Sequence, residues 1–208
     1  MVEKVSQKIL DILSDESDNQ EQRDILLFGI TRIVEDIPKY IGLLIICLLL
    51  SVIKQFILVM FVTIVYKTFT GGVHLHTNIG CFICAIISIL LCIYLPQLII
   101  KYDSIRIPLH IIVYIFSVYA ILVYVPADVP EIPIINEKRR RRDKIMSFLA
   151  LNLLYIISIF IINSNLYACT IIVSILNIDI MTTRIMYKIF KNKYGYETYV
   201  PDELLMTE

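Results

Sequence analysis

Two histidines and two cysteines lie close together in the sequence, between two strongly apolar stretches. The segment Thr70–Cys81 reads TGGVHLHTNIGC, and Cys84 follows one helical turn later. His74 could act as the general base for the thiol of Cys81, because cysteine–histidine pairs perform nucleophilic catalysis on acyl groups. The same residue types could instead bind zinc, with His74, His76, Cys81 and Cys84 as four ligands. A third interpretation is a glycine hinge or gate between two spans, with no catalytic role.

The spacing of His74 and Cys81 excludes a direct pair on one continuous helix. Seven residues place the two side chains on one face but about 10 Å apart along the axis, whereas a hydrogen bond needs about 3 Å. Gly71, Gly72 and Gly80 favour a break in the helix, so that a loop could fold His74 back over the next helix. Cys81 would then lie in a first helical turn, where the peptide dipoles favour the thiolate. Backbone N–H groups of the three glycines could bind the oxyanion.

The composition predicts a protein that crosses a membrane several times. Of the 208 residues, 58% are hydrophobic and only 18% are charged, whereas soluble domains are about half apolar and about a quarter charged. The mean hydropathy is +0.76. Residues 1–36 contain no apolar core with a cleavage site, so we expect no cleavable signal peptide. The cysteines are odd in number and three of them lie in apolar runs, so we expect no disulfide framework.

The apolar stretches predict an all-α fold with about four to six transmembrane helices. Residues 1–39 contain two amphipathic patterns, the second ending at Pro38, which predict helices at the membrane surface; helices covering a core are the alternative. Residues 40–66 are either one long span or two shorter segments that meet at Lys54–Gln55. The remaining candidate spans are residues 79–100, 105–125, 145–162 and 166–181.

Basic residues predict the orientation of the chain. Lys138–Arg142 and Lys144 lie in a long loop, which we expect on the cytoplasmic side. Thr70–Cys81 is two spans earlier, and the basic segment after residue 183 is two spans later, so both should face the cytoplasm. Asp179, near the end of the last span, is expected at the membrane interface close to Arg184.

Two separated motifs resemble the accessory gene regulator B (AgrB) family of membrane endopeptidases. YKTFTGGVHLHTNIGC, residues 66–81, resembles the family signature at Gly71, Gly72, His74 and Cys81. VPADVPEIPI, residues 125–134, is similar to the family's proline–acid loop and matches it at Pro126, Ala127, Asp128, Pro133 and Ile134. The chain departs from the family pattern at Lys67, where arginine is common, at Val73, where an aromatic residue is common, and at Ile132, where lysine is usual.

The resemblance implies a cysteine endopeptidase that processes the precursor of a cyclic quorum-sensing peptide. Cys81 would attack a peptide bond in the C-terminal part of a short precursor, with His74 as base and then acid. A thiol or hydroxyl of the precursor would then attack the thioester and close a ring without ATP. Lys67, Gly71, Gly72 and Asp128 are the candidate supporting residues. Asp128 could orient His74, or it could be only a turn residue after Pro126.

The expected organisation has three parts. Residues 1–39 form the surface helices, residues 40–183 form the transmembrane endopeptidase domain, and residues 184–208 form a cytoplasmic tail. The expected partners are a short precursor peptide and membrane lipid, with a homodimer as a further candidate; we expect no nucleic acid, cofactor or metal. The location implied is the bacterial plasma membrane, with the site on the cytoplasmic side.

Several alternatives remain open from the residues alone. A non-enzymatic membrane binding or transport protein would use the glycines as a gate, and a zinc protein would use the four His and Cys ligands. The basic run EKRRRR, residues 137–142, could fix the topology or dock an acidic precursor tail.

Overall fold

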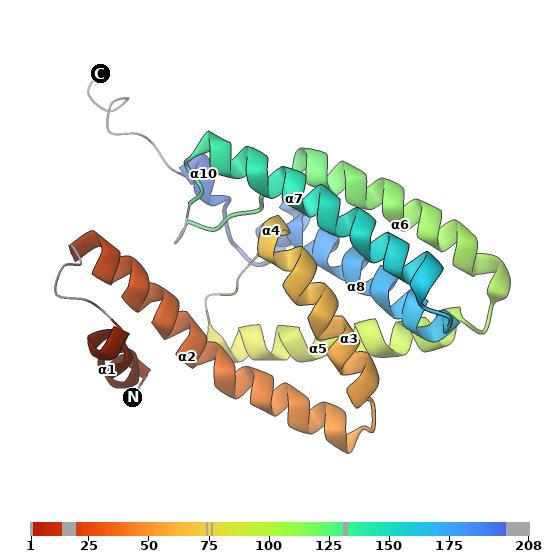
Figure 1. The fold of residues 1–208 in the computed structure, drawn as a ribbon, viewed down its shortest axis with the longest axis horizontal. Helices are drawn as coiled ribbons and strands as arrows, with labels where there is room; N and C mark the ends of the chain where they lie inside the picture. The colour runs from red at the N-terminus through yellow and green to blue at the C-terminus, as the bar shows by residue number, and fades with distance from the viewer. Residues whose placement is uncertain (1, 14–19, 74, 76, 131–132, 199–208) are drawn as a thin grey trace. The chain divides into compact units, whose positions relative to one another are not determined.

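The computed structural model describes residues 2–13, 20–73, 75, 77–130 and 133–198 (Figure 1). Within these residues the chain is helical, with an isolated β-bridge and no β-strand. The all-α prediction is therefore confirmed. In the described part, five helices are long and apolar enough to cross a membrane, which agrees with the predicted four to six. The chain is a multi-pass membrane protein, and its candidate spans are Ile53–Thr70, Ile79–Ile99, Arg106–Val123, Glu137–Ile161 and Asn165–Thr182.

Residues 1–53 form one compact unit with two helices, α1 (Val2–Leu13) and α2 (Gln20–Leu49), which pack against each other. Helix α2 continues through Pro38, so the predicted helix end at Pro38 was wrong. A proline removes one backbone hydrogen bond, and the apolar sequence that follows it sustains the helix. The chain then turns at Ser51, which has a φ of 56°. Residues 40–66 are therefore divided between two helices, and the break lies before Lys54–Gln55.

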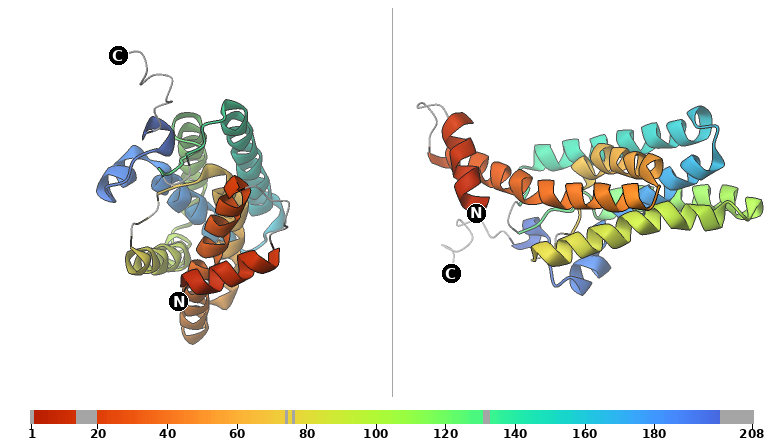
Figure 2. Two further views of the ribbon diagram at one scale, coloured as in Figure 1. Left: turned by 90° about the vertical axis from the view of Figure 1, so that its left-hand side faces the viewer. Right: turned by 90° about the horizontal axis from the view of Figure 1, so that it is seen from below.

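The second compact unit, residues 54–208, contains the remaining helices. Helix α8 is its centre: 61% of its span window is buried, against 22% to 33% in the other four spans. Helices α5, α6 and α7 all contact α8 (Figures 1 and 2). The elements are α3 (Ile53–Val62), the π-helical turn η1 (Thr63–Lys67), α4 (Thr68–Thr70), α5 (Asn78–Ile99), α6 (Asp103–Val123), α7 (Glu137–Ile156), the π-helical turn η2 (Ile157–Ile161), α8 (Asn165–Thr182), α9 (Arg184–Ile189) and α10 (Gly195–Thr198).

A buried carboxyl group ties α8 to η1. Asp179 is fully buried, and its Oδ1 accepts a hydrogen bond of 2.8 Å from the Tyr66 hydroxyl, which is also buried. Asp179 does not pair with Arg184, because its side chain points into the bundle and Arg184 pairs with Glu197. Tyr66 lies in η1, which leads to Gly71 and Gly72. The Tyr66–Asp179 hydrogen bond therefore attaches the chain just before the glycine pair to the core of the bundle.

The basic run lies in a helix, not in the predicted loop. Helix α7 begins at Glu137, and the Asn136 side chain caps it by accepting hydrogen bonds from the amides of Lys138 (2.9 Å) and Arg139 (3.2 Å). Asparagine is a favoured N-cap residue and arginine a good helix former. The local sequence therefore starts the helix two turns before the apolar residues begin.

Candidate functional site

The two sequence motifs meet in space through backbone pairing. Gly71 and Ala127 form a parallel bridge, in which the Gly72 amide donates to the Ala127 carbonyl (2.9 Å). The Ala127 amide in turn donates to the Thr70 carbonyl, also at 2.9 Å. The glycine pair and the proline–acid loop are therefore one structural feature, although two spanning helices separate them in the sequence.

Gly71 has no room for a side chain. Its φ is +74°, and a Cβ built on it would lie 2.3 Å from the Ala127 carbonyl oxygen. Gly72 also has a positive φ, of +137°. Beyond Gly72, the Val73 amide donates to the Met181 carbonyl at 3.0 Å, near the end of α8. Residues 70–73 are therefore held between the proline–acid loop and α8.

The amides of the glycines are not available to bind an oxyanion, so that prediction was wrong. The Gly71 amide donates to the Lys67 carbonyl (2.9 Å), and the Gly72 amide donates to Ala127. The Gly80 amide donates to the Thr77 hydroxyl at 3.2 Å. These acceptors are set by the three-dimensional pairing and by the cap of α5. The glycines therefore shape the chain and do not serve as donors.

The two carboxylate oxygens of Asp128 differ in their hydrogen bonds: Oδ2 has two described partners and Oδ1 has none. Its side chain is 1% exposed. Oδ2 accepts hydrogen bonds from the Ile134 amide (2.9 Å) and the Arg140 guanidinium (3.2 Å). Oδ1 is also buried, and it has no hydrogen-bond partner among the described residues. A buried acceptor normally has a partner, so Oδ1 is the group through which Asp128 could act on a neighbour.

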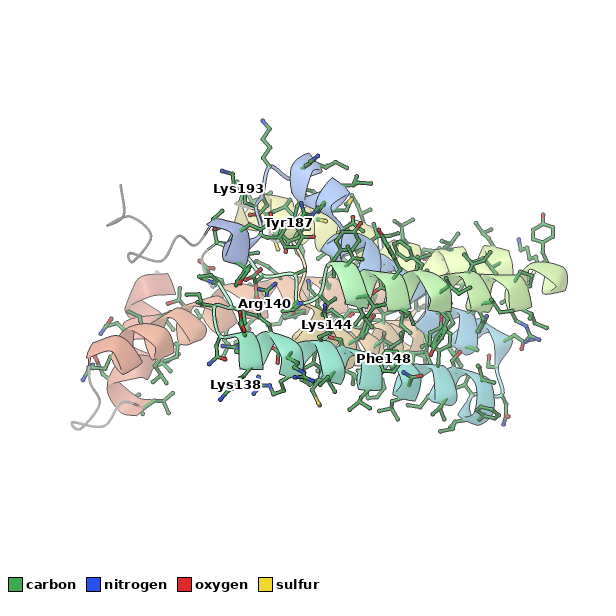
Figure 3. All side chains as sticks on the ribbon, turned by 90° about the horizontal axis from the view of Figure 1, so that it is seen from above. Lys138, Arg140, Lys144, Phe148, Tyr187 and Lys193 are labelled. Atoms are coloured by element: carbon green, nitrogen blue, oxygen red, sulfur yellow. The ribbon has the colours of Figure 1, made fainter. Side chains whose placement is uncertain are left out.

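Arg140 organises the proline–acid loop, a role that could not be predicted from its position in the sequence. Besides Asp128, its guanidinium donates to the carbonyls of Ile134 (3.3 Å) and Pro126 (3.5 Å). It also lies over the ring of Tyr196, 4.3 Å from the ring centroid. Nothing in a run of four arginines distinguishes Arg140 from its neighbours. Figure 3 shows it on α7 beside the loop, with Lys138 further out on the same helix.

The segment after α8 packs against the same loop. The Tyr187 hydroxyl donates to the Asp128 carbonyl at 3.0 Å, and the Gly195 amide donates to the same oxygen at 3.3 Å. Tyr187 and Tyr194 stack, with ring centroids 4.1 Å apart. Burial raises the pKa of both phenols. The sequence predicts a tail from residue 184 onward, but residues 184–198 pack against the Asp128 loop.

Cys81 lies near the start of α5, as its position after the glycines predicts. The helix begins at Asn78, with Thr77 as N-cap, and the Cys81 amide donates to the Thr77 carbonyl at 2.9 Å. The thiol is free and its residue is partly exposed. Helical side chains lean toward the N-terminus, so the Cys81 sulfur lies over the first turn. The amides of that turn precede the regular intrahelical hydrogen bonds.

Cys84 and Lys67 lie close to this helix start. Cys84 is partly exposed, one turn after Cys81 on the same side of α5. Lys67, at the end of η1, lies within electrostatic range of the Cys84 thiol. The structure thus brings a cation from η1 toward the face of α5 that carries both cysteines.

His74 and His76 lie outside the described residues, so the predicted His74–Cys81 pair has no described geometry. The flanking residues are described: Val73 is bound to α8, and Thr77 caps α5. Two of the four proposed zinc ligands, Cys81 and Cys84, are described. In the part of the chain that the structure covers, no group of three or more His, Cys, Asp or Glu side chains could hold a metal ion.

Comparisons with known proteins agree with these motifs. The sequence profile described as accessory gene regulator B matches residues 4–185. An AgrB-like protein of Clostridium perfringens (strain 13 / Type A) is 21% identical over 152 residues, which cover 69% of each chain. A second AgrB-like protein, from strain SM101 of the same species, is 23% identical over 151 residues, again 69% of each chain. No solved structure has significant similarity to this chain.

Proposed function

This chain belongs to the accessory gene regulator B family, and we propose that it is a membrane cysteine endopeptidase that also promotes cyclisation of its peptide product. Membership of the family indicates a role in the agr quorum-sensing system and in peptide processing. The proposal of a cysteine endopeptidase rests mainly on the pairing of Gly71 with Ala127. It joins the segment before His74 to the loop of Asp128, at the end of the bundle where α5 begins.

In the proposed reaction the Cys81 thiol loses its proton to His74 and attacks a peptide carbonyl of the precursor. The tetrahedral intermediate then collapses, and the C–N bond breaks as His74 returns the proton to the leaving amine. The product is a thioester on Cys81 and a released C-terminal fragment. An internal thiol or hydroxyl of the precursor next gives its proton to His74 and attacks the thioester carbonyl. The C–S bond to Cys81 breaks, and the Cys81 thiolate recovers that proton. A thiolactone or lactone forms, and no ATP is consumed because the acyl group stays activated on sulfur.

Asp128 is the proposed orienting group for His74. Oδ1 is buried and has no partner among the described residues, while Arg140 and Ile134 fix Oδ2. An imidazole N–H bonded to Oδ1 would satisfy that oxygen and set the tautomer of His74, as the acid of a catalytic triad does. The loop carrying Asp128 pairs with residues 70–72, directly before Val73 and His74.

The oxyanion donors we propose are the amides of Asn78 and Ile79. They belong to the first turn of α5, which leaves its N–H groups without intrahelical acceptors. The Cys81 side chain leans over that turn, so the oxygen of a carbonyl group attacked by the Cys81 sulfur would lie near these amides. Lys67 is the proposed source of positive charge beside the face of α5 that carries the two cysteines. A membrane boundary also limits water, which would otherwise hydrolyse the thioester.

We further propose that the site faces the cytoplasm from the bacterial plasma membrane. The start of α7 carries the basic run, and short basic segments next to a span stay on the cytoplasmic side. Gly71, Ala127 and Arg140 lie together, so the site and the basic run share one side.

The experiment compares four single-residue variants of the full chain in membranes. The substrate is a short precursor peptide with an amphipathic start, a central Cys or Ser and an acidic end. We expect Cys81→Ala and His74→Ala to abolish its cleavage while the protein still inserts. Cys84→Ala is the matched control, and it should cleave at close to the normal rate.

Normal cleavage by Cys81→Ala would refute the endopeptidase proposal. Loss of activity in Cys84→Ala and His76→Ala, together with stoichiometric zinc in the purified protein, would favour the zinc alternative. Insertion is measured as the amount of protein in the membrane fraction, so that loss of expression is not mistaken for loss of chemistry.

A further inference from the structure

We infer that residues 184–198 are a positioning part of the site and that Tyr187 is their principal contact. This inference rests on the proposed function, because it concerns how Asp128 is held beside the His74 segment. No described contact joins the C-terminal segment to Cys81. The role of the segment is therefore to position the loop, not to take part in the chemistry.

Asp128 is fixed from two sides by different elements. Arg140 of α7 and the Ile134 amide hold its side chain through Oδ2. Tyr187 of α9 and the Gly195 amide hold its backbone carbonyl, at 3.0 and 3.3 Å. A carboxylate whose side chain alone is held can still rotate with its loop. The hydrogen bonds from Tyr187 and Gly195 also fix the backbone of Asp128. The direction in which the unpartnered Oδ1 points therefore depends on the C-terminal segment.

Tyr187 is itself held in place. Its ring stacks on Tyr194 with an angle of 3° between the ring planes, and the Tyr194 hydroxyl donates to the Thr182 carbonyl. Gly195 lies so close to the loop that an added Cβ would be 2.3 Å from the Val129 carbonyl oxygen. Both tyrosines are almost fully buried. Such contacts are typical of packed structure and not of a solvated tail.

The same segment connects the two walls of the site. Thr182, the acceptor for Tyr194, follows Met181, whose carbonyl binds the Val73 amide. The C-terminal segment is therefore attached beside residues 70–73 through Tyr194, and to the Asp128 loop through Tyr187 and Gly195. Tyr196 adds a contact to Arg140 through its ring.

A small displacement of Asp128 should lower the rate of chemistry more than substrate binding. A shift of about 1 Å in a catalytic arrangement can reduce the rate by about 100-fold, and a single lost hydrogen bond should have a smaller effect. For Tyr187→Phe we expect kcat for precursor cleavage to fall by about 10-fold with KM nearly unchanged. Tyr196→Phe keeps the ring over Arg140 and is the control; its kcat should not change.

A second readout follows the cysteine directly. The rate of Cys81 alkylation by iodoacetamide, mapped by mass spectrometry, reports the thiolate at each pH. If His74 is oriented through Asp128, the thiolate–imidazolium pair weakens in Tyr187→Phe. Its alkylation profile should then shift to higher pH, while that of Tyr196→Phe should match the parent chain. Gly195→Ala, which displaces the loop by a different route, should shift the profile in the same direction.

The outcomes separate this inference from the proposed function. If Cys81→Ala abolishes cleavage but Tyr187→Phe and Gly195→Ala change neither kcat nor the alkylation profile, the positioning role is refuted and the endopeptidase proposal stands. A fall in activity that only matches a loss of folded protein, or appears only in KM, would also refute it. If Cys81→Ala cleaves normally, the proposed function fails, and an unshifted alkylation profile in Tyr187→Phe would then refute the positioning role as well.

Discussion

Gly71 is the residue at which backbone conformation and packing both exclude a side chain. Its φ of +74° is rare for any other residue, and the Ala127 carbonyl occupies the space of a Cβ. The glycine pair is recognisable in the sequence, and a break in the helix before Cys81 follows from it. The acceptor of the Gly72 amide could not be predicted, because Ala127 lies two spans away.

Gly71→Ala should therefore destabilise the protein strongly. Backbone strain alone would cost about 1–3 kcal/mol, and the clash with Ala127 adds to it. Gly29→Ala is the matched control, since Gly29 is helical and a Cβ there meets nothing within 4 Å. We expect Gly29→Ala to stabilise by about 0.5–1 kcal/mol. Thermal unfolding in detergent measures both; equal melting temperatures for Gly71→Ala and the parent chain would contradict the bridge.

At the scale of elements, α7 and the C-terminal segment hold the proline–acid loop between them. The start of α7 follows from the Asn136 cap, which is a local signal. The partner of each arginine is not local. Arg139 and Arg142 pair with Asp143 in their own helix, whereas Arg140 reaches back to Asp128. Sequence reasoning could therefore predict a basic segment but not the one arginine that supports the loop.

Removing one arginine at a time separates this contact from an effect on topology. Arg140→Gln and Arg141→Gln each remove a single positive charge, so their effects on membrane orientation should be equal. Arg140→Gln also removes the partner of a buried carboxylate, which should cost about 1.5–3 kcal/mol of stability and most of the cleavage activity. Arg141 is exposed, and Arg141→Gln should leave both nearly unchanged. Equal behaviour of the two variants would show that the run acts only through its charge.

The buried tyrosines of the C-terminal segment predict a loss of stability at alkaline pH. Burial raises the pKa of Tyr187 and Tyr194 in the folded state. Their contribution is fully present below the unfolded value of about 10 and is lost as the pH rises toward the folded values, because the unfolded chain then releases protons more readily. Between about pH 9 and about pH 11, Tyr187→Phe should lose less stability than the parent chain. A control with Tyr196→Phe should follow the parent; identical pH dependence in all three proteins would contradict this explanation.

At the scale of the whole molecule, hydropathy predicts the spans well because a bilayer requires long apolar helices. It predicts polar residues within them less well. Asp179 lies near the end of the last span, where an interfacial position is reasonable, yet it is buried against Tyr66. That contact depends on how α8 packs against η1, and the hydrophobic periodicity of a single segment does not predict such packing. The helix end predicted at Pro38 was also wrong, because the loss of one hydrogen bond does not determine where a long helix ends.

The orientation can be tested with single cysteines in a chain whose native cysteines are replaced. Ser164→Cys and Tyr102→Cys lie in turns that should face outward, so an impermeant maleimide should label both in intact cells. Asn136→Cys and Lys193→Cys should be labelled only after the cells are permeabilised. Labelling of Asn136→Cys from outside would reverse the proposed topology and move the site away from the cytoplasm.

We propose that the precursor becomes attached to Cys81 through a thioester, and this attachment can be detected by mass spectrometry. A precursor whose ring-closing Cys or Ser is replaced by alanine can be cleaved but cannot leave the enzyme by cyclisation. We predict that, with this precursor, mass spectrometry finds the N-terminal fragment on Cys81, in a bond that neutral hydroxylamine breaks. Cleavage of the precursor with no adduct on Cys81, or with the adduct on another residue, would contradict a thioester intermediate on Cys81.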